Sequence, residues 1–162
     1  LLLPDVVKSV AAVEGYKGAE LKAKVDAILA ELFAFAAEAN NQVPVVMQYC
    51  RRRIDRTLKK LDLSASIDVT TLAADYKAKT NSLDVAAIAK LATDNIQSAI
   101  STKNTEALLR SYDNKGILSI ASKAKGLKVA QFEQWIVRTL RNNTAPSVSD
   151  AIRKALPLIV AS

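Results

Sequence analysis

Hydrophobic positions recur along much of the chain at intervals of three and four residues, which is the period of an amphipathic α-helix. The clearest case lies between Ala19 and Ala39, where the apolar stripe comprises Leu21, Val25, Ile28, Leu29, Leu32, Phe33 and Ala36. A second stripe, made of Met47, Cys50, Ile54, Leu58 and Leu61, predicts a helix that starts near Pro44, because proline fits the first turn of a helix. Asn40 and Asn41 separate the two helices, so we expect an antiparallel hairpin.

Shorter helices are expected elsewhere, over residues 4–14, 68–77, 82–100, 106–112, 117–125 and 129–141, with a last one that Ser147 to Asp150 would cap and Pro157 would stop. Gly15 and Gly18 bracket a break, and residues 113–116 indicate a turn. Asp68 and Ser82 are candidate N-caps. In helix 82–100 we expect Leu83, Ala87, Leu91 and Ile96 on the apolar face.

Composition supports a helical fold. The hydrophobic half of the chain is mostly Ala, Leu, Val and Ile, and four Gly and four Pro are too few for the turns of an all-β protein. We therefore predict an all-α helical bundle of about eight or nine helices. The polar run at 101–105 marks a boundary between a long-helix part, residues 1–100, and a basic short-helix part, residues 105–162, although the two can also pack as one domain.

The net charge of +7 is unevenly distributed. Residues 51–60 carry a net charge of +5 and residues 101–162 carry +6, whereas residues 1–50 and 61–100 each carry −2. On a helix, Arg52, Arg56, Lys59 and Lys60 share one broad side, roughly opposite the stripe of Cys50, Ile54 and Leu58. Such a face binds phosphate-rich polymers through counterion release, or simply keeps a long amphipathic helix solvated.

The segment 118–137 contains a helix, a glycine turn at Gly126 and a second helix, with Ala121 small enough for close packing and Leu127, Phe132 and Trp135 at buried positions. It resembles a helix-turn-helix, from which Ser122 and Lys125 depart. The resemblance implies that Lys128, Gln131, Gln134 and Arg138 face base edges, while Lys123, Lys125 and Arg141 contact phosphates. The alternative is an αα-hairpin with Trp135 in the core.

Catalysis is not expected. The chain has no His, its single Cys50 cannot complete a thiolate metal site, and no glycine-rich phosphate loop is present. We therefore expect no catalytic residue, metal or cofactor. The most apolar stretch, residues 27–37, is too short to cross a bilayer, so we expect a soluble protein without a membrane span. Cys50 can form no intrachain disulfide, which is compatible with a reducing compartment, and we expect an intracellular, cytoplasmic location.

The leading interpretation is a non-catalytic nucleic-acid-binding domain, with DNA favoured over RNA. Its predicted binding residues are Arg51, Arg52, Arg53, Arg56, Lys59, Lys60, Lys123, Lys125, Lys128, Gln131, Gln134, Arg138 and Arg141. The alternative is a helical protein–protein interaction or assembly module of a larger protein, suggested by the apolar 27–37 helix and by a first residue, Leu1, that is not Met. A third interpretation is peripheral attachment to an anionic membrane through the basic helix. The sequence does not define an oligomeric state.

Overall fold

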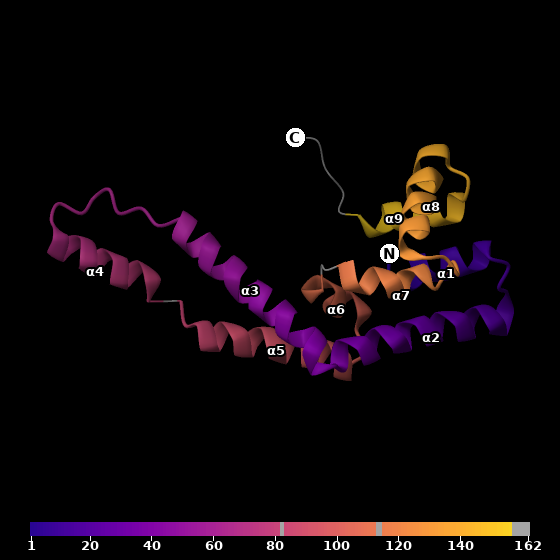
Figure 1. The fold of residues 1–162 in the computed structure, drawn as a ribbon, viewed down its shortest axis with the longest axis horizontal. Helices are drawn as coiled ribbons and strands as arrows, with labels where there is room; N and C mark the ends of the chain where they lie inside the picture. Colours follow the sequence, from indigo (N-terminus) through magenta and orange to yellow (C-terminus); the bar gives the residue numbers. More distant parts are fainter. Residues whose placement is uncertain (82, 113–114, 157–162) are drawn as a thin grey trace.

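A computed structural model describes residues 1–81, 83–112 and 115–156, and within them the chain is all-helical with no strand. The expected all-α class is confirmed. The molecule is elongated: one end is a cluster of helices, and a long projection leaves it and ends in α4 (Figure 1).

The helices are α1 (Pro4–Val13), α2 (Gly18–Ala37), α3 (Ala39–Lys59), α4 (Val69–Thr80), α5 (Val85–Ser101), α6 (Thr105–Ser111), α7 (Leu118–Ser122), α8 (Val129–Asn142) and α9 (Pro146–Ala155), with a 3-10 turn, η1, at Lys115–Ile117. Pro4 begins α1 as expected. Gly15 and Gly18 both adopt positive φ angles, 96° and 52°, at the break before α2. Left-handed backbone of this kind costs glycine little, so these residues allow the sharp turn between α1 and α2.

The head, which we define as α1, α2 and α6 to α9, holds most of the hydrophobic core. α1 packs against α2 and α9, α2 against α7, and α8 against both α7 and α9. Leu32, Leu108 and Val148 are completely buried there. Burial of such side chains is the main force that stabilises this cluster.

The core combines residues from both sides of the polar run at 101–105. Lys103 takes a left-handed φ of 50°, and the side chain of Asn104 caps α6 by accepting a hydrogen bond from the Ala107 amide at 3.0 Å. Tyr112, only 2% exposed, donates its hydroxyl to the carbonyl oxygen of Ala36 at 3.2 Å. The core therefore joins α2 to the short helices that follow this polar run. That residues 1–100 and 105–162 are separate folding units stays a prediction.

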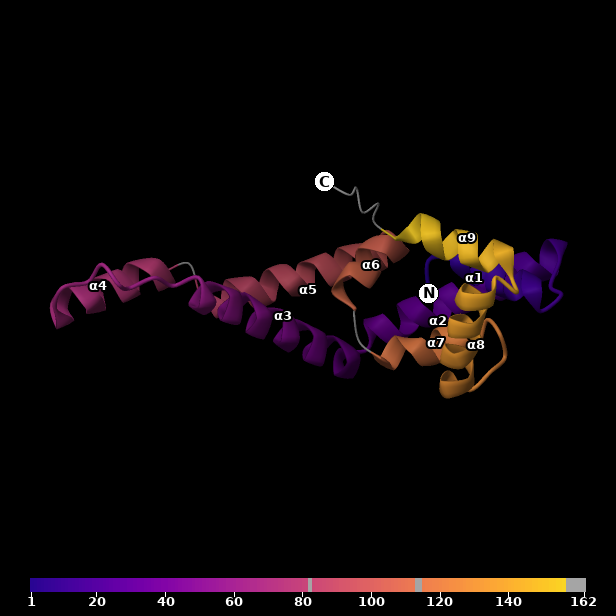
Figure 2. The ribbon, with the colours of Figure 1, turned by 90° about the horizontal axis from the view of Figure 1, so that it is seen from above.

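The arm, which we define as α3, α4 and α5, projects from the head. α3 and α5 pack against each other, and at the root of the arm Val45, Ile96 and Ala99 belong to the core. α4 lies beyond the far end of α3, at the tip, in both views (Figures 1 and 2). The arm therefore places a short helix far from the head.

The expected antiparallel hairpin of the second and third helices is wrong. A single residue, Glu38, with φ −70° and ψ 128°, separates α2 from α3, and the chain runs onward into the arm (Figure 1). One extended residue kinks the chain but does not reverse it. α3 starts at Ala39, so Pro44 lies inside the helix instead of in its first turn.

Two smaller expectations also need correction. In α5 the expected Ile96 is buried, together with Ala92 and Ala99, whereas Ala87 is exposed and Leu91 is 54% exposed. The buried side of α5 therefore includes Ile96 but not Leu91. Asp84 caps this helix, and the predicted cap Ser82 lies outside the described residues. α9 begins at Pro146 without a side-chain cap, because Ala145 occupies the cap position.

Candidate interaction surfaces

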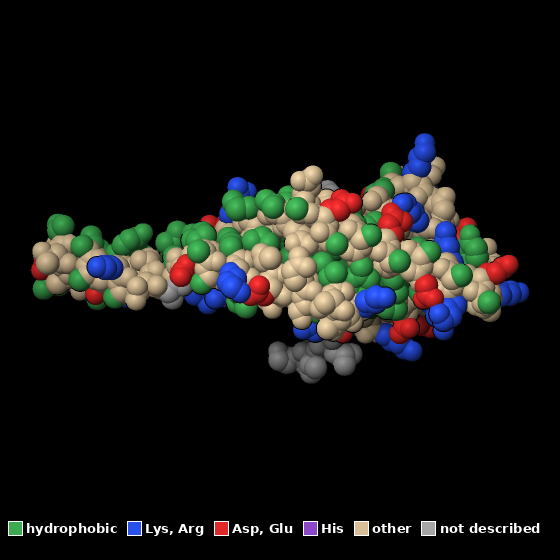
Figure 3. Space-filling view, turned by 90° about the horizontal axis from the view of Figure 1, so that it is seen from below, with side chains coloured by type: hydrophobic (Ala, Val, Ile, Leu, Met, Phe, Trp, Pro, Cys, Tyr) green, Lys and Arg blue, Asp and Glu red, His purple; other side chains and the backbone are tan. Residues whose placement is uncertain are grey.

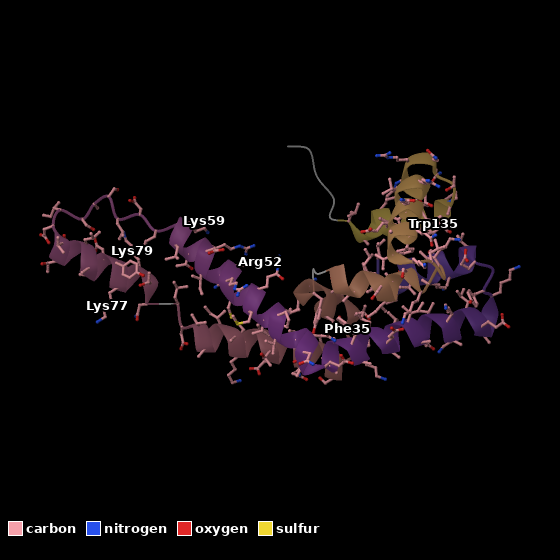
Figure 4. The ribbon with its side chains drawn as sticks, in the orientation of Figure 1. Phe35, Arg52, Lys59, Lys77, Lys79 and Trp135 are labelled. Carbon is pink, nitrogen blue, oxygen red and sulfur yellow. The ribbon has the colours of Figure 1, made fainter. Side chains whose placement is uncertain are left out.

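The basic run of α3 lies on the surface of the arm. Its predicted binding residues, Arg51, Arg52, Arg53, Arg56, Lys59 and Lys60, are all exposed. On the expected apolar side of the helix Cys50 is buried and Ile54 is half-buried, whereas Leu58 is 43% exposed. The apolar stripe is therefore covered only in its first part. In Figure 4, Arg52 and Lys59 lie on α3, and Lys77 and Lys79 lie on α4, so cations are distributed along much of the arm.

Most of these α3 cations have no counter-charge. Arg51, Arg53, Arg56, Lys59 and Lys60 form no ion pair with any residue that the structure describes. Elsewhere cations are often paired, as Lys90 is with Asp94 at 2.6 Å on α5. The basic run is therefore a local excess of positive charge that an anionic partner can neutralise.

The segment 118–137 contains the glycine turn that the sequence predicts. Gly126 has a φ of 70°, and the Leu127 amide donates to the Ser122 carbonyl at 3.2 Å. This pairing is typical of a helix that ends at a left-handed glycine. α7 is only five residues long, shorter than the expected 117–125 helix.

α8 buries Phe132 and Ile136, and Trp135 is half-buried, with its ring stacked on Phe132 at a centroid distance of 6.0 Å. Its predicted contact residues are exposed: Gln131, Gln134, Arg138 and Arg141 on the helix, with Lys128 at its N-cap. Glu133 is exposed beside them. The outer, exposed side of α8 is therefore largely polar, with more cations than carboxylates, and it also contains the exposed Val137 and Leu140.

Lys123 and Lys125, the predicted phosphate contacts, are engaged within the head. Lys123 pairs with Glu31 of α2, and Lys125 pairs with Glu14. The Lys125 side chain is only 15% exposed, and its ammonium lies 4.8 Å from the centroid of the Trp135 ring. Such a cation is stabilised by its carboxylate and by the aromatic face. Both lysines thus join the glycine turn to the rest of the head.

The two basic regions lie far apart along the molecule. α3 belongs to the arm and α8 to the opposite end, with α6 and α7 between them in the ribbon (Figures 1 and 2). A short ligand that touches one region does not reach the other without spanning much of the long axis. Each region is therefore considered as a separate surface.

The largest departure from ordinary packing is in the outer part of the arm. We define the distal arm as residues 51–81 and 83–91, and none of these described residues is buried. It exposes large apolar side chains, of which Ile67 and Val69 are 89% and 81% exposed, together with Leu58, Leu72, Tyr76, Val85 and Leu91. Figure 3 shows hydrophobic side chains along the arm as far as its tip. Apolar surface gathered in this way is typical of an interaction site.

Polar contacts close the tip of the arm. Asp68 caps α4 by accepting a hydrogen bond from the Thr71 amide at 2.8 Å, as the sequence predicts. Ser66 donates to Asp75 at 2.7 Å, and Lys79 donates to the Asp62 carbonyl. The hydrogen bond from the Thr71 amide lowers the pKa of Asp68 below its ordinary value. The tip is thus held by caps and hydrogen bonds, without a core.

A groove of about 1090 Å³ opens in the head between the N-terminal residues, α6, α7 and α9. Apolar side chains such as Leu3, Leu109 and Leu118 line much of it. Arg110, which also lines the groove, is paired with Glu106 at 2.6 Å. This groove has no signature in the sequence, because its lining comes from segments that are far apart in the chain.

Within the described part of the chain, no group of His, Cys, Asp and Glu is arranged to hold a metal ion. No described helix combines the length and apolar character that crossing a membrane requires. Cys50 is buried and unpaired. The candidate interaction surfaces considered for a function are the distal arm, the basic run of α3 and the outer side of α8.

Comparison with known proteins identifies no similar protein. No known protein-family model matches the chain, and neither does any curated protein or any solved structure.

Proposed function

We propose that this chain is a helical interaction and assembly module whose docking element is the distal arm. The observation that carries the proposal is that none of the described residues from 51 to 91 is buried, although seven large apolar side chains of this segment are exposed. An arm that only spaced two parts of a protein would be expected to carry polar side chains at those positions.

The length of α4 supports the same proposal. α4 has 12 residues and buries none of them. Isolated helices shorter than about 12–15 residues are marginal in water, and most helical stability in proteins comes from packing. A partner that covers Val69, Leu72 and Tyr76 would supply the packing that α4 lacks within its own chain.

The experiment is site-specific photo-crosslinking in the cells that produce the protein. A photoreactive amino acid is placed at Tyr76 of α4, which is 50% exposed, and in a control chain at Val137 of α8, which is 45% exposed. We expect a discrete crosslinked product from position 76 and none from position 137. Equal products from both positions, or none from position 76, would contradict the proposal.

Nucleic-acid binding is the second candidate function. It is favoured by the α3 cations Arg53, Arg56 and Lys59, which are exposed and form no ion pair with a described carboxylate. Phosphate contacts need accessible positive charge and no particular base sequence. The outer side of α8 offers Lys128, Arg138 and Arg141 as a separate cationic surface.

This second candidate is tested by fluorescence-anisotropy titration with labelled single-stranded and double-stranded DNA and RNA at two salt concentrations. Saturable binding that weakens steeply with salt, and weakens further in an Arg53→Gln/Arg56→Gln variant, is the expected result. Lys22→Gln is the matched control, because Lys22 is exposed but paired with Asp26. Absence of binding at low salt would eliminate the candidate.

A further inference from the structure

The chain changes direction at one residue between α2 and α3 (Figure 1). Glu38 has a φ of −70°, which is an ordinary helical value, and a ψ of 128°, which is extended. A helix needs a ψ of about −42°, so rotation about one bond separates the observed kink from a continuous helix. Ala37 and Ala39, on either side of Glu38, are good helix formers. The local backbone therefore does not enforce the kink by itself.

Two side-chain amides replace the backbone amides that the kink removes from the helix. In a continuous helix the carbonyls of Phe35 and Ala36 would each accept a hydrogen bond from the backbone amide four residues later. In the structure Asn41 Nδ2 donates to the Phe35 carbonyl at 2.9 Å, and Gln42 Nε2 donates to the Ala36 carbonyl at 2.7 Å. Side chains that insert into the hydrogen-bond ladder of a helix cause kinks. Asn41 and Gln42 therefore stabilise the kinked backbone.

Gln42 also connects the arm to the head. It is only 8% exposed, and its Oε1 accepts a hydrogen bond from Gln97 Nε2 of α5 at 3.0 Å. The Ala36 carbonyl to which it donates also accepts the hydroxyl of Tyr112, the residue after α6, at 3.2 Å. The Tyr112 ring contacts Phe35 edge-on at a centroid distance of 6.4 Å, and Figure 4 shows Phe35 at this junction. One buried amide thus joins α3 to α2 and α5.

The geometry points to a hinge at the α2–α3 junction with two discrete states: a kinked state that Gln42 latches, and a straight state in which α2 and α3 form one helix. A carbonyl oxygen has two lone pairs, and Gln42 and Tyr112 use both at Ala36 in the kinked state. The backbone amide of Asn40 takes this carbonyl only when Gln42 leaves it. The state of the hinge sets the direction of the arm, whatever the distal arm binds, so this inference goes beyond the proposed function.

Other contacts of the junction differ in how they affect the two states. Pro44 already lies inside α3, so its missing amide leaves the same carbonyl without a helical donor in both states. α5 packs against both α2 and α3, which favours the kinked state. The unchanged chain is therefore expected to be kinked, and the straight state is expected when the latch is removed.

The test is a distance measurement by double electron–electron resonance on the full 162-residue chain. Spin labels are attached at Ala23→Cys in α2 and Arg56→Cys in α3, which are exposed positions, in a Cys50→Ala background. At a rise of 1.5 Å per residue, a continuous helix would hold positions 23 and 56 about 50 Å apart, and the kink brings them closer. We expect the shorter distance in this background and a shift to the longer one in Asn41→Leu/Gln42→Met.

Amide hydrogen exchange followed by NMR distinguishes a straight helix from a loose joint. In the kinked state the backbone amides of Ala39 and Asn40 begin α3 and have no acceptor in a preceding turn. In the straight state they donate to Phe35 and Ala36, so their exchange should slow at least about tenfold in the double variant. Methionine has a length similar to that of glutamine but no donor. The matched control is Gln48→Met, the same change at an exposed position of α3, which should alter neither distance nor exchange.

A milder variant retains Gln42. Gln97→Leu removes only the donor to Gln42 Oε1, from an exposed position of α5, so it tests the latch even if the double variant does not fold. We expect the longer distance in a fraction of its molecules.

Four results would overturn the inference. The first is an unchanged chain that already shows the longer distance, and the second is a double variant that keeps the shorter one. The third is a broad spread of distances without slower exchange of the amides at positions 39 and 40, because the joint would then only have loosened. The fourth applies if the double variant does not fold: a Gln97→Leu chain with the same single distance as the unchanged chain.

Discussion

In the head, Leu32, Leu108 and Val148 are completely buried, whereas in the distal arm Ile67 and Val69 are 89% and 81% exposed. Both regions are built from helices, and both have apolar residues at helical spacing. The difference is that the head helices pack on several neighbours, while α4 lies alone at the tip (Figure 2). Helical periodicity therefore defines an apolar side of a helix but not the element that covers it.

Cations show the same contrast. In the head, Lys123 and Lys125 pair with Glu31 and Glu14 and help to fasten the glycine turn. In the arm, Arg53 and Arg56 pair with no described carboxylate. Positive charge in the head thus contributes to folding, whereas in the arm it remains available to a partner.

The largest expected difference in stability is between two leucine truncations, one in the head and one in the distal arm. Leu108→Ala should lower the free energy of unfolding by about 2–5 kcal/mol, because it leaves a cavity in a site that is completely buried. Leu72→Ala, at a position 41% exposed, should change it by less than about 1 kcal/mol. Urea unfolding of dilute protein followed by circular dichroism measures both. Equal losses would show that the two regions are equally packed.

A smaller effect is expected from removing a cation in each region. Lys125→Gln should destabilise the fold by about 1–2 kcal/mol, because it removes an ion pair and a contact with the Trp135 ring. Arg56→Gln should change stability by no more than about 0.5 kcal/mol, since Arg56 is exposed. Thermal unfolding of the two variants makes the comparison. If Arg56→Gln lost more stability than Lys125→Gln, the proposal that the arm cations serve binding would be contradicted.

Tyr112 gives the head a dependence on alkaline pH. Burial raises the pKa of Tyr112 above its ordinary value of 10.0. Below pH 10.0 the phenol is neutral in both the folded and the unfolded chain, so its contribution to stability is fully present. As pH rises further, the unfolded chain ionises first, so this contribution is lost as pH rises through the folded pKa.

In Tyr112→Phe, this part of the decrease in stability at alkaline pH should disappear. The variant should also be less stable by about 1 kcal/mol at neutral pH, because the hydrogen bond to the Ala36 carbonyl is lost. Unfolding curves at a series of pH values test both effects. An alkaline loss of the same size in Tyr112→Phe would show that another group causes it.

The smallest expected effect is local to the arm. Asp68→Ala removes the acceptor of the Thr71 amide, so the first turn of α4 should exchange its amide hydrogens faster while the head is unchanged. Asp68→Asn is the control, because asparagine also caps helices well. The pKa of Asp68 is lowered from its ordinary value of 3.8 by the same hydrogen bond. Its stabilising effect is therefore present above that value and is lost as pH falls through the folded pKa. An unchanged exchange rate in Asp68→Ala would show that packing holds α4.

Much of the fold was predictable because its signals are local. The spacing of Leu21, Val25 and Ile28 predicts α2, and Gly126 predicts the turn before α8. The all-α class follows from such patterns. The start of α3 was misplaced because Pro44 is tolerated inside that helix, and the single extended residue Glu38 has no sequence signature.

The surfaces were less predictable because they depend on residues distant in the chain. Nothing near Lys125 indicates that Glu14 neutralises it, since 111 positions separate the two. Val69, Leu72 and Tyr76 of α4 have helical spacing in the sequence, but the sequence does not reveal that these three side chains stay exposed. The exposed α3 cations were identified correctly by charge and helical register, and their role stays a prediction.

Hydrogen exchange of the purified chain, measured by mass spectrometry, tests most directly whether the distal arm lacks packing within its own chain. We expect the amide hydrogens of α4 to exchange much faster than those of α2 and α8, because no residue of α4 is buried. Exchange in α4 as slow as in the head would contradict the proposed docking role of the arm.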